Sequence, residues 1–206
     1  MTISSWLPMT KGDWMYYDFD ITYIFVIVGM LITLLASAKM KATFSKYKTV
    51  ASSTNLTGSQ VAERILRANG IYDVQVRQVA GELTDHYDPR SKTVSLSGTI
   101  FNSVSVAAVS VAAHECGHAI QDEEGYVPLK LRTVFAPIAN IVSTLSGILI
   151  TAGLAFGFLG LARVGVLLFT FVVIFRLITL PVEIDASRRA LIAIEENDLL
   201  RGSELE

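Results

Sequence analysis

SVSVAAVSVAAHECGHAIQ, residues 103–121, is a run rich in Ala and Val that contains no Gly or Pro ahead of its last turns. The run predicts a helix, and it carries the H-E-x-x-H pattern. Residues i and i+4 share one face of a helix, so His114 and His118 can offer imidazole nitrogens to a single metal ion. Glu115 lies beside them, close enough to reach a metal-bound water without coordinating the metal itself.

The histidine pair has two interpretations. Two neutral imidazoles and one carboxylate form a common ligand set for catalytic zinc, with the fourth position open to water. The alternative is a pair of hydrogen-bonded histidines on a buried helix without a metal. We favour the metal site because the pattern falls on a predicted helix, and we expect one zinc ion per chain. The chain must then supply a third ligand from outside this helix.

The composition narrows the class of protein. Of 206 residues, 51% are hydrophobic, and the mean hydropathy is +0.48. The formal net charge of −2 gives no basic footprint, so no nucleic-acid partner is expected. Cys116 is the single cysteine, which excludes an intramolecular disulfide. These values fit either a very apolar globular protein or a small membrane protein with one folded domain.

The distribution of apolar residues favours the membrane protein. Residues 21–38 carry no charge, and a helix of this length spans about 27 Å, close to the thickness of a bilayer core. A longer uncharged run at 133–160 and its continuation to 180 predict two further spans, joined by a tight turn near 158–164. The expected organisation is an extracytoplasmic N-terminus (1–20), a transmembrane helix (21–38), a basic linker (39–57), a zincin catalytic subdomain (58–132), a transmembrane hairpin (133–180) and a helical tail (181–206).

The positions of Lys and Arg predict the orientation in the membrane. Eleven of them lie between residues 39 and 132 and three follow Pro181, out of 17 in the chain. Lys11 and Arg163 fall in segments expected on the opposite, extracytoplasmic side of the membrane, and Arg176 lies within a span. By the positive-inside rule, we expect a multi-pass protein with its catalytic subdomain on the cytoplasmic side.

The region between the first span and the motif reads as a small mixed subdomain. Residues 59–70 predict an amphipathic helix, and the alternation at 71–81 predicts a half-buried strand. Two further extended segments surround a turn at 88–91. With the motif helix, these elements predict an α+β fold: three transmembrane helices plus a small catalytic domain of helix, β-sheet and HExxH helix.

The third ligand is sought beyond the hairpin. Pro181 should break or kink the last span and redirect the helix that follows. Glu183 is then the first carboxylate at the cytoplasmic end of the hairpin. Asp185 is the alternative, but it lies about 200° further around a helix and shares its face with Arg189, a pairing partner at i+4. Helical geometry favours Glu183 and leaves Asp185 open.

Three segments together resemble a known family. LTDHYDP at 83–89, VAAHECGHAIQ at 111–121 and PVEIDASRRA at 181–190 are similar, in sequence and order, to motifs of the bacterial putative neutral zinc metallopeptidases, membrane proteins of the gluzincin type. The resemblance runs from about residue 58 to 190, spans included. It implies a protein of the bacterial inner or cell membrane.

The resemblance also implies roles for individual residues. His114 and His118 correspond to zinc ligands, Glu115 to the catalytic base and Glu183 to the third zinc ligand. Cys116 departs from the family pattern, which usually has Val or another apolar residue there. It points away from the ligand face, so we expect it to pack as a small side chain. Family members also generally continue into a further apolar helix, whereas this sequence ends at residue 206.

His86 is the only other histidine in the sequence, and two roles are open for it. It could donate a hydrogen bond to the developing oxyanion, or orient substrate, from a strand bordering the cleft. It could equally be a turn histidine bonded to Asp85 or Asp88, two residues that we expect to be structural.

The sequence as a whole predicts a membrane-anchored zinc endopeptidase with Glu115 as general base. Its expected partners are peptide or protein substrates, including membrane-associated ones, and the lipid bilayer; the oligomeric state is not indicated. The alternative is a non-catalytic membrane scaffold or adaptor with a zinc-stabilised domain. Glu115 argues against that alternative, because a structural zinc site needs no such carboxylate and favours a fourth protein ligand.

Overall fold

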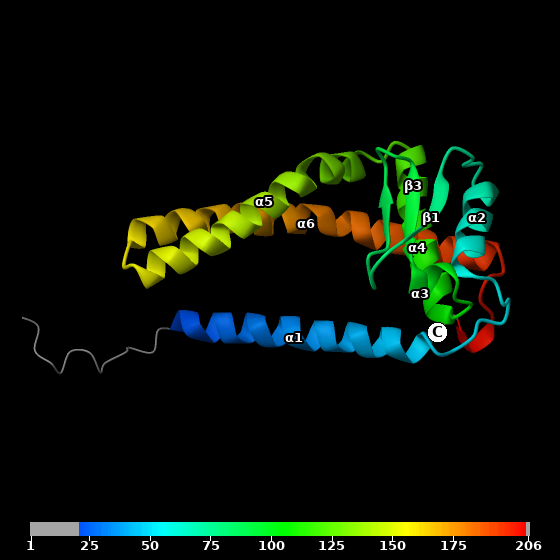
Figure 1. Ribbon diagram of the computed structural model, residues 1–206, viewed down its shortest axis with the longest axis horizontal. Coiled ribbons are helices and arrows are strands. Elements are labelled where there is room, and N and C mark those ends of the chain that lie inside the picture. Colours follow the sequence, from blue (N-terminus) through cyan, green and yellow to red (C-terminus); the bar gives the residue numbers. More distant parts are fainter. Residues whose placement is uncertain (1–20, 205–206) are drawn as a thin grey trace, which may run out of the picture. The chain divides into compact units, whose positions relative to one another are not determined.

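The computed structural model describes residues 21–204 (Figure 1). The expected N-terminal segment, residues 1–20, lies outside the described residues. The chain divides after Ser45 into two compact units, residues 1–45 and 46–206. Its elements in order are α1 (Ile21–Tyr47), α2 (Gly58–Ala68), β1 (Gln75–Val79), β2 (His86–Asp88), β3 (Thr93–Ser97), α3 (Gly98–Phe101), α4 (Val106–Glu123), α5 (Val127–Ala155), α6 (Leu159–Glu196) and the 3-10 turn η2 (Gly202–Glu204).

The predicted fold class is confirmed by this arrangement of helices around a small sheet. Three helices, α1, α5 and α6, are long and apolar enough to cross a membrane. Helix α1 continues past the expected end of the span at residue 38 as far as Tyr47. The Lys, Ala and Met residues beyond 38 favour helix, so the first part of the predicted basic linker is helical.

The sheet places its shortest strand at one edge. The strand order is β1-β3-β2, with β3 parallel to β1 and antiparallel to β2. Every residue of the central strand β3 is buried, whereas His86 in β2 is exposed. The edge of β2 that does not face β3 is therefore not covered by another strand of this sheet.

Helix α4 lies at the centre of the subdomain that contains the sheet. The hydroxyl of Ser105 caps it by accepting a hydrogen bond from the backbone N–H of Ala108, at 3.2 Å. Its Ala-rich surface allows close packing, and Ala108, Ala112 and Ala113 are fully buried. The helix packs against α2 on one side and against the C-terminal half of α6 on another.

Helices α5 and α6 form the predicted hairpin. They run side by side in opposite directions and are joined by a turn at residues 156–158, slightly earlier than the sequence predicted (Figure 1). Gly157 adopts a φ of 72° in this turn, a left-handed conformation that suits glycine. Most of the large apolar side chains of the hairpin are exposed, as expected for a surface that faces lipid.

The sequence predicted a break or a kink at Pro181, and the break is absent. Helix α6 is continuous from Leu159 to Glu196 with Pro181 in its interior. Pro removes one backbone hydrogen bond, but the residues after it are held by tertiary packing, since Val182 and Ala186 are both 0% exposed. The last span therefore extends directly into the helix that carries Glu183.

Candidate metal centre

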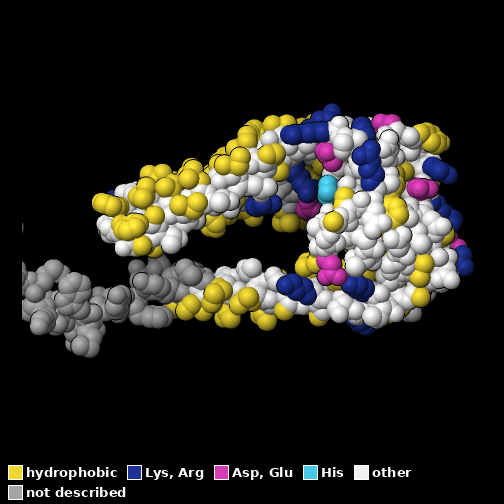
Figure 2. Space-filling model, viewed as in Figure 1, with side chains coloured by type: hydrophobic (Ala, Val, Ile, Leu, Met, Phe, Trp, Pro, Cys, Tyr) yellow, Lys and Arg dark blue, Asp and Glu magenta, His cyan; other side chains and the backbone are white. Residues whose placement is uncertain are grey.

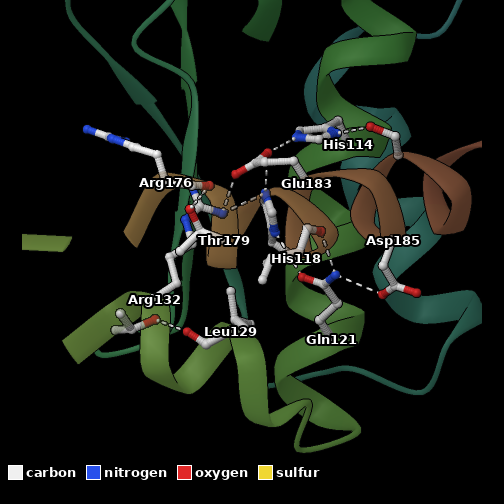
Figure 3. Close-up of polar contacts among 12 residues, drawn as sticks. His114, His118, Gln121, Leu129, Arg132, Arg176, Thr179, Glu183 and Asp185 are labelled. Atoms are coloured by element: carbon white, nitrogen blue, oxygen red, sulfur yellow. Dashed lines mark hydrogen bonds and ion pairs between the residues drawn. The ribbon is translucent and has the colours of Figure 1, made fainter. Parts of the chain in front are cut away.

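Three side chains from two helices converge on one point. The ligand-type atoms of His114, His118 and Glu183 all lie within 4.8 Å of one another. The Oε2 atom of Glu183 is 3.3 Å from Nε2 of His114 and 3.5 Å from Nε2 of His118. Figure 3 shows both imidazole rings directed at this carboxylate. Two imidazoles and a carboxylate at this separation match the donor set and spacing of a mononuclear zinc site.

The convergence depends on a close approach of two helices. A Cβ atom added to Gly117 would lie 2.4 Å from the backbone oxygen of Ala186. The glycine between the two histidines therefore lets the backbone of α6 lie directly against α4. Glu183 is one helical turn before Ala186, so this contact sets the height of its carboxylate relative to the imidazoles.

Gln121 holds His118 in one tautomer. Its amide nitrogen donates to the carbonyl of Val182 at 2.9 Å and to Oδ2 of Asp185 at 2.8 Å. The amide oxygen is then the atom that faces Nδ1 of His118, at 3.0 Å. Because this oxygen can only accept, Nδ1 donates to it, and Nε2 faces Glu183.

Asp185 lies in a different network from the histidines. Its Oδ2 atom accepts from Nε of Arg189 at 2.6 Å, the i+4 pair expected from the sequence, and Arg189 also contacts Glu124 at 2.7 Å. Of the two carboxylates considered for the third ligand, the structure brings Glu183 to the histidines and turns Asp185 toward Arg189.

His114 is positioned by the same helix. Its Nδ1 is 3.2 Å from the hydroxyl of Ser187, one turn beyond Glu183 on the same face of α6. The hydrogen bond to Glu183 raises the pKa of His114 above its ordinary value, against the opposing effect of burial. Glu183 and Ser187 together therefore fix both ring nitrogens of His114.

Arg132 contacts the cluster from α5. Its Nη1 lies 2.7 Å from Oε1 of Glu183 and 3.2 Å from Nε2 of His118. The two oxygens of Glu183 thus have different partners: Oε2 faces the histidines, and Oε1 is held by a guanidinium. A carboxylate fixed in this way presents one oxygen to a metal while the other is hydrogen-bonded.

Glu115 is placed beside the cluster without joining it. The residue is 7% exposed, and burial raises the pKa of its carboxyl above the usual range. It lines a cavity of about 300 Å³ together with His114 and Val111. A second cavity of about 430 Å³ lies on the His118 side. The three converging side chains therefore have open space on both flanks.

His86 lies apart from the converging side chains, on the edge strand. Its Nδ1 is 2.8 Å from the backbone oxygen of Thr84, and the residue lines the larger cavity with His118. Asp85 instead accepts from the backbone N–H of Ser97 at 2.7 Å, and Asp88 holds the turn after β2. The local bond of His86 is thus to a backbone carbonyl and not to either aspartate.

Cys116 faces the opposite side of α4. It is fully buried, its Sγ lies 3.6 Å from the carbonyl of Ala62 in α2, and burial raises the pKa of the thiol. This placement agrees with the packing role expected for a small side chain.

Three contributors to the site were missed by sequence reasoning: Gln121, Arg132 and Ser187. Gln121 and Ser187 each lie one helical turn from a predicted ligand, which is a local signal that could have identified them. Arg132 has no such signal, because its helix reaches the cluster only through the tertiary fold.

Comparisons with known proteins agree with this geometry. The putative neutral zinc metallopeptidase family matches residues 22–206. The chain is 43% identical over 183 residues to the putative membrane protease YugP of Bacillus subtilis (strain 168), covering 88% of this chain and 81% of the relative. No solved structure matches. With the match extending over almost its whole length, this chain belongs to the putative neutral zinc metallopeptidase family.

Proposed function

We propose that this protein is a membrane-anchored zinc endopeptidase of the gluzincin type, with His114, His118 and Glu183 as the zinc ligands. The convergence of these three side chains from α4 and α6 is the observation that carries the proposal. The membership of a zinc peptidase family and the similarity to a protein described as a membrane protease support it. One zinc ion per chain is expected for a single mononuclear site.

Each ligand has a partner that prepares it for a metal. Gln121 keeps the proton on Nδ1 of His118, Ser187 contacts Nδ1 of His114, and Arg132 holds the second oxygen of Glu183. Both Nε2 atoms and one carboxylate oxygen are thereby directed at the same point. Such outer contacts orient ligands and typically contribute about 10–100-fold to metal affinity.

Glu115 is the proposed general base. Zinc, when bound, supplies a Lewis acid that polarises the scissile carbonyl and increases the acidity of water. Glu115 accepts the proton of the attacking water and returns it to the leaving amine. Its burial favours the first of these steps, because a carboxyl with a raised pKa accepts a proton more readily than an exposed one.

The substrate is proposed to lie extended beside β2. The outer edge of this strand has no neighbouring strand in the sheet among the described residues, and such an edge can bind an extended peptide by strand addition. The two cavities that flank the cluster give such a peptide room on both sides of the scissile bond. His86, on this edge, either orients the substrate or hydrogen-bonds the developing oxyanion.

The site is proposed to lie at the cytoplasmic surface of the membrane. Helix α6 is continuous through Pro181, so Glu183 is only about 5 Å along the helix from the expected end of the span at residue 180. The excess of Lys and Arg in residues 39–132 supports the cytoplasmic side. Substrates that are themselves associated with the membrane would reach this position readily.

Metal analysis and peptide cleavage by the detergent-purified protein test the proposal together. We expect about one zinc per chain, lost in the double variant His114→Ala with His118→Ala. Glu115→Gln should keep the zinc but lose hydrolysis by several orders of magnitude, since the ligands remain and the base does not.

Two results would contradict the proposal. Full zinc occupancy in the double histidine variant would refute the assignment of the ligands. Zinc in the wild type without any hydrolysis of peptides, and with Glu115→Gln indistinguishable from the wild type, would favour the non-catalytic scaffold.

A further inference from the structure

The larger cavity beside the metal centre has a specific charge pattern. It lies between the edge strand β2 with its following turn and the first turns of α5, and His118 forms part of its wall. Arg90 and Arg132 line it, together with an apolar side formed by Leu129, Ala136 and Pro137. On the face seen in Figure 2, a histidine side chain is visible among charged side chains where the hairpin meets the subdomain.

The acidic groups near this cavity are already engaged. Asp88 accepts the backbone N–H of Arg90 at 3.0 Å and the hydroxyl of Ser91 at 2.7 Å, and the Ser91 bond is the main reason why the pKa of Asp88 is lowered. Glu183 belongs to the metal cluster and to Arg132. Neither carboxylate is available to a further cation.

Arg90 is the cation of this cavity that forms no ion pair among the described residues, and its charge contributes to lowering the pKa of Asp88. Its Nη2 atom donates to the backbone oxygen of Thr133 at 3.2 Å, which holds the guanidinium against the start of α5. Among residues 21–204, no carboxylate oxygen lies within ion-pair distance of it. One N–H of Arg90 is thus used to position the guanidinium. A guanidinium has five N–H donors in total, so four are left for other contacts.

Positive charge continues toward the membrane side of the cavity. Asn140 lines the far end, and its amide oxygen accepts from Arg176 at 3.1 Å. Arg176 precedes Glu183 by two turns of α6, about 10.5 Å, and shares its helical face. Figure 3 shows Arg132 and Arg176 on the same side of Glu183. The lining of the cavity therefore combines the guanidinium groups of Arg90 and Arg132 with apolar side chains, and Arg176 lies next to the lining residue Asn140.

We infer that this cavity is a substrate subsite that selects an acidic side chain, Glu or Asp, close to the scissile bond. The inference rests on the proposed peptidase function and names its substrate class. Because His118 is part of the wall and an extended peptide advances about 3.3 Å per residue, the selected residue lies within about two positions of the cleaved bond. Its methylene groups contact the apolar side, and its carboxylate pairs with Arg90.

The test begins with the full-length protein in detergent and a proteome-derived peptide library. Mass spectrometry identifies the cleaved bonds, and Glu115→Gln protein serves as the blank. We expect Glu or Asp to be enriched at one fixed position near the cleaved bond. Matched peptides with Glu or Gln at that position should differ in kcat/KM by about tenfold or more, the effect of a charge-assisted hydrogen bond, and the difference should shrink in high salt.

Arg90→Gln and Arg90→Glu identify the residue responsible. The first should abolish the preference for Glu over Gln, and the second should invert it toward Lys, while the zinc content stays at the wild-type value. Arg67→Gln is the matched control, since Arg67 is an exposed arginine of α2 that pairs with Glu63 at 3.7 Å and does not line this cavity. It should leave the preference unchanged.

A binding measurement separates this inference from the proposed function. Glu115→Gln protein, loaded with zinc, is titrated with fluorescent decapeptides that carry a single Glu or Gln at each position in turn. Preferential binding of the Glu peptides that is lost in the added Arg90→Gln change would support the subsite even if no peptide were cleaved. Cleavage without an acidic preference, or a preference unaffected by Arg90→Gln and Arg90→Glu, would overturn the subsite and leave the peptidase assignment intact.

Discussion

Gly117→Ala is expected to damage both the stability of the protein and its metal site. The added Cβ would lie 2.4 Å from the backbone oxygen of Ala186 and 3.0 Å from its carbonyl carbon, so α4 and α6 must separate by about 1 Å to reach ordinary contact. Both atoms belong to a helix backbone, and no rotamer change can relieve the overlap. Overpacking of this kind costs about 3 kcal/mol at the upper end, and the better helix propensity of Ala returns about 1 kcal/mol. The net loss is about 2 kcal/mol.

The same displacement acts on the ligands. Metal–ligand distances tolerate changes of only about 0.2 Å, whereas Glu183 lies one turn from the overlapping residue and would move with α6. We expect zinc affinity to fall about 10–100-fold, the range seen when the supporting contacts of a site are lost. Competition with a chelator measures the affinity, and thermal denaturation in detergent with and without chelator separates fold stability from metal binding.

Gly147→Ala is the matched control for this experiment. Gly147 lies within α5, and a Cβ added there would meet no atom within 4 Å. The substitution should leave zinc affinity and thermal stability close to those of the wild type. If Gly117→Ala behaved like this control in both measurements, the close contact of α4 with α6 could not be what positions Glu183.

Three further substitutions test individual contacts of the site, and a labelling experiment tests the placement of Cys116. Gln121→Leu removes the bonds that orient His118 and should weaken zinc binding about tenfold or more in a chelator competition, without removing a ligand; unchanged affinity would exclude the orienting role. Glu183→Ala should abolish tight zinc binding. Asp185→Ala should keep most of the zinc affinity and lower the melting temperature, because it loses only the Arg189 and Gln121 contacts. If Asp185→Ala weakened zinc binding more than Glu183→Ala did, Asp185 would be the third ligand. Cys116 should resist a maleimide in the native protein and react after denaturation, since its thiol is fully buried with a raised pKa, and rapid native labelling would contradict that placement.

Local rules, meaning helical spacing and the composition of short segments, predicted those parts of the site that lie on one helix. The i, i+4 spacing places His114 and His118 on one face of α4 wherever that helix lies, and the opposite direction of Cys116 follows from the same periodicity. The three apolar helices were also predictable, because length and charge-free composition alone identify them. The contact of Asp185 with Arg189 at i+4 was expected for the same reason of helical spacing.

Local rules failed where packing between distant segments competes with them. Pro181 was expected to break or kink the last span, but the helix runs through it, and burial of Val182 and Ala186 against α4 holds the residues that follow. The redirection of the chain that Pro181 was expected to provide is not needed. The uninterrupted helix already carries Glu183 from the span to the histidines.

The sequence by itself determined the membrane helices, the subdomain elements and the histidine pair, since each depends on residues a few positions apart. Only the tertiary structure decided which carboxylate meets that pair, because Glu183 and Asp185 are both presented by a helix whose rotation is set by its packing on α4 at Gly117. It also brought Arg132 from α5 onto Glu183. These contacts join segments far apart in the chain, and their free energy comes from burial over whole helix faces, which no short sequence pattern encodes.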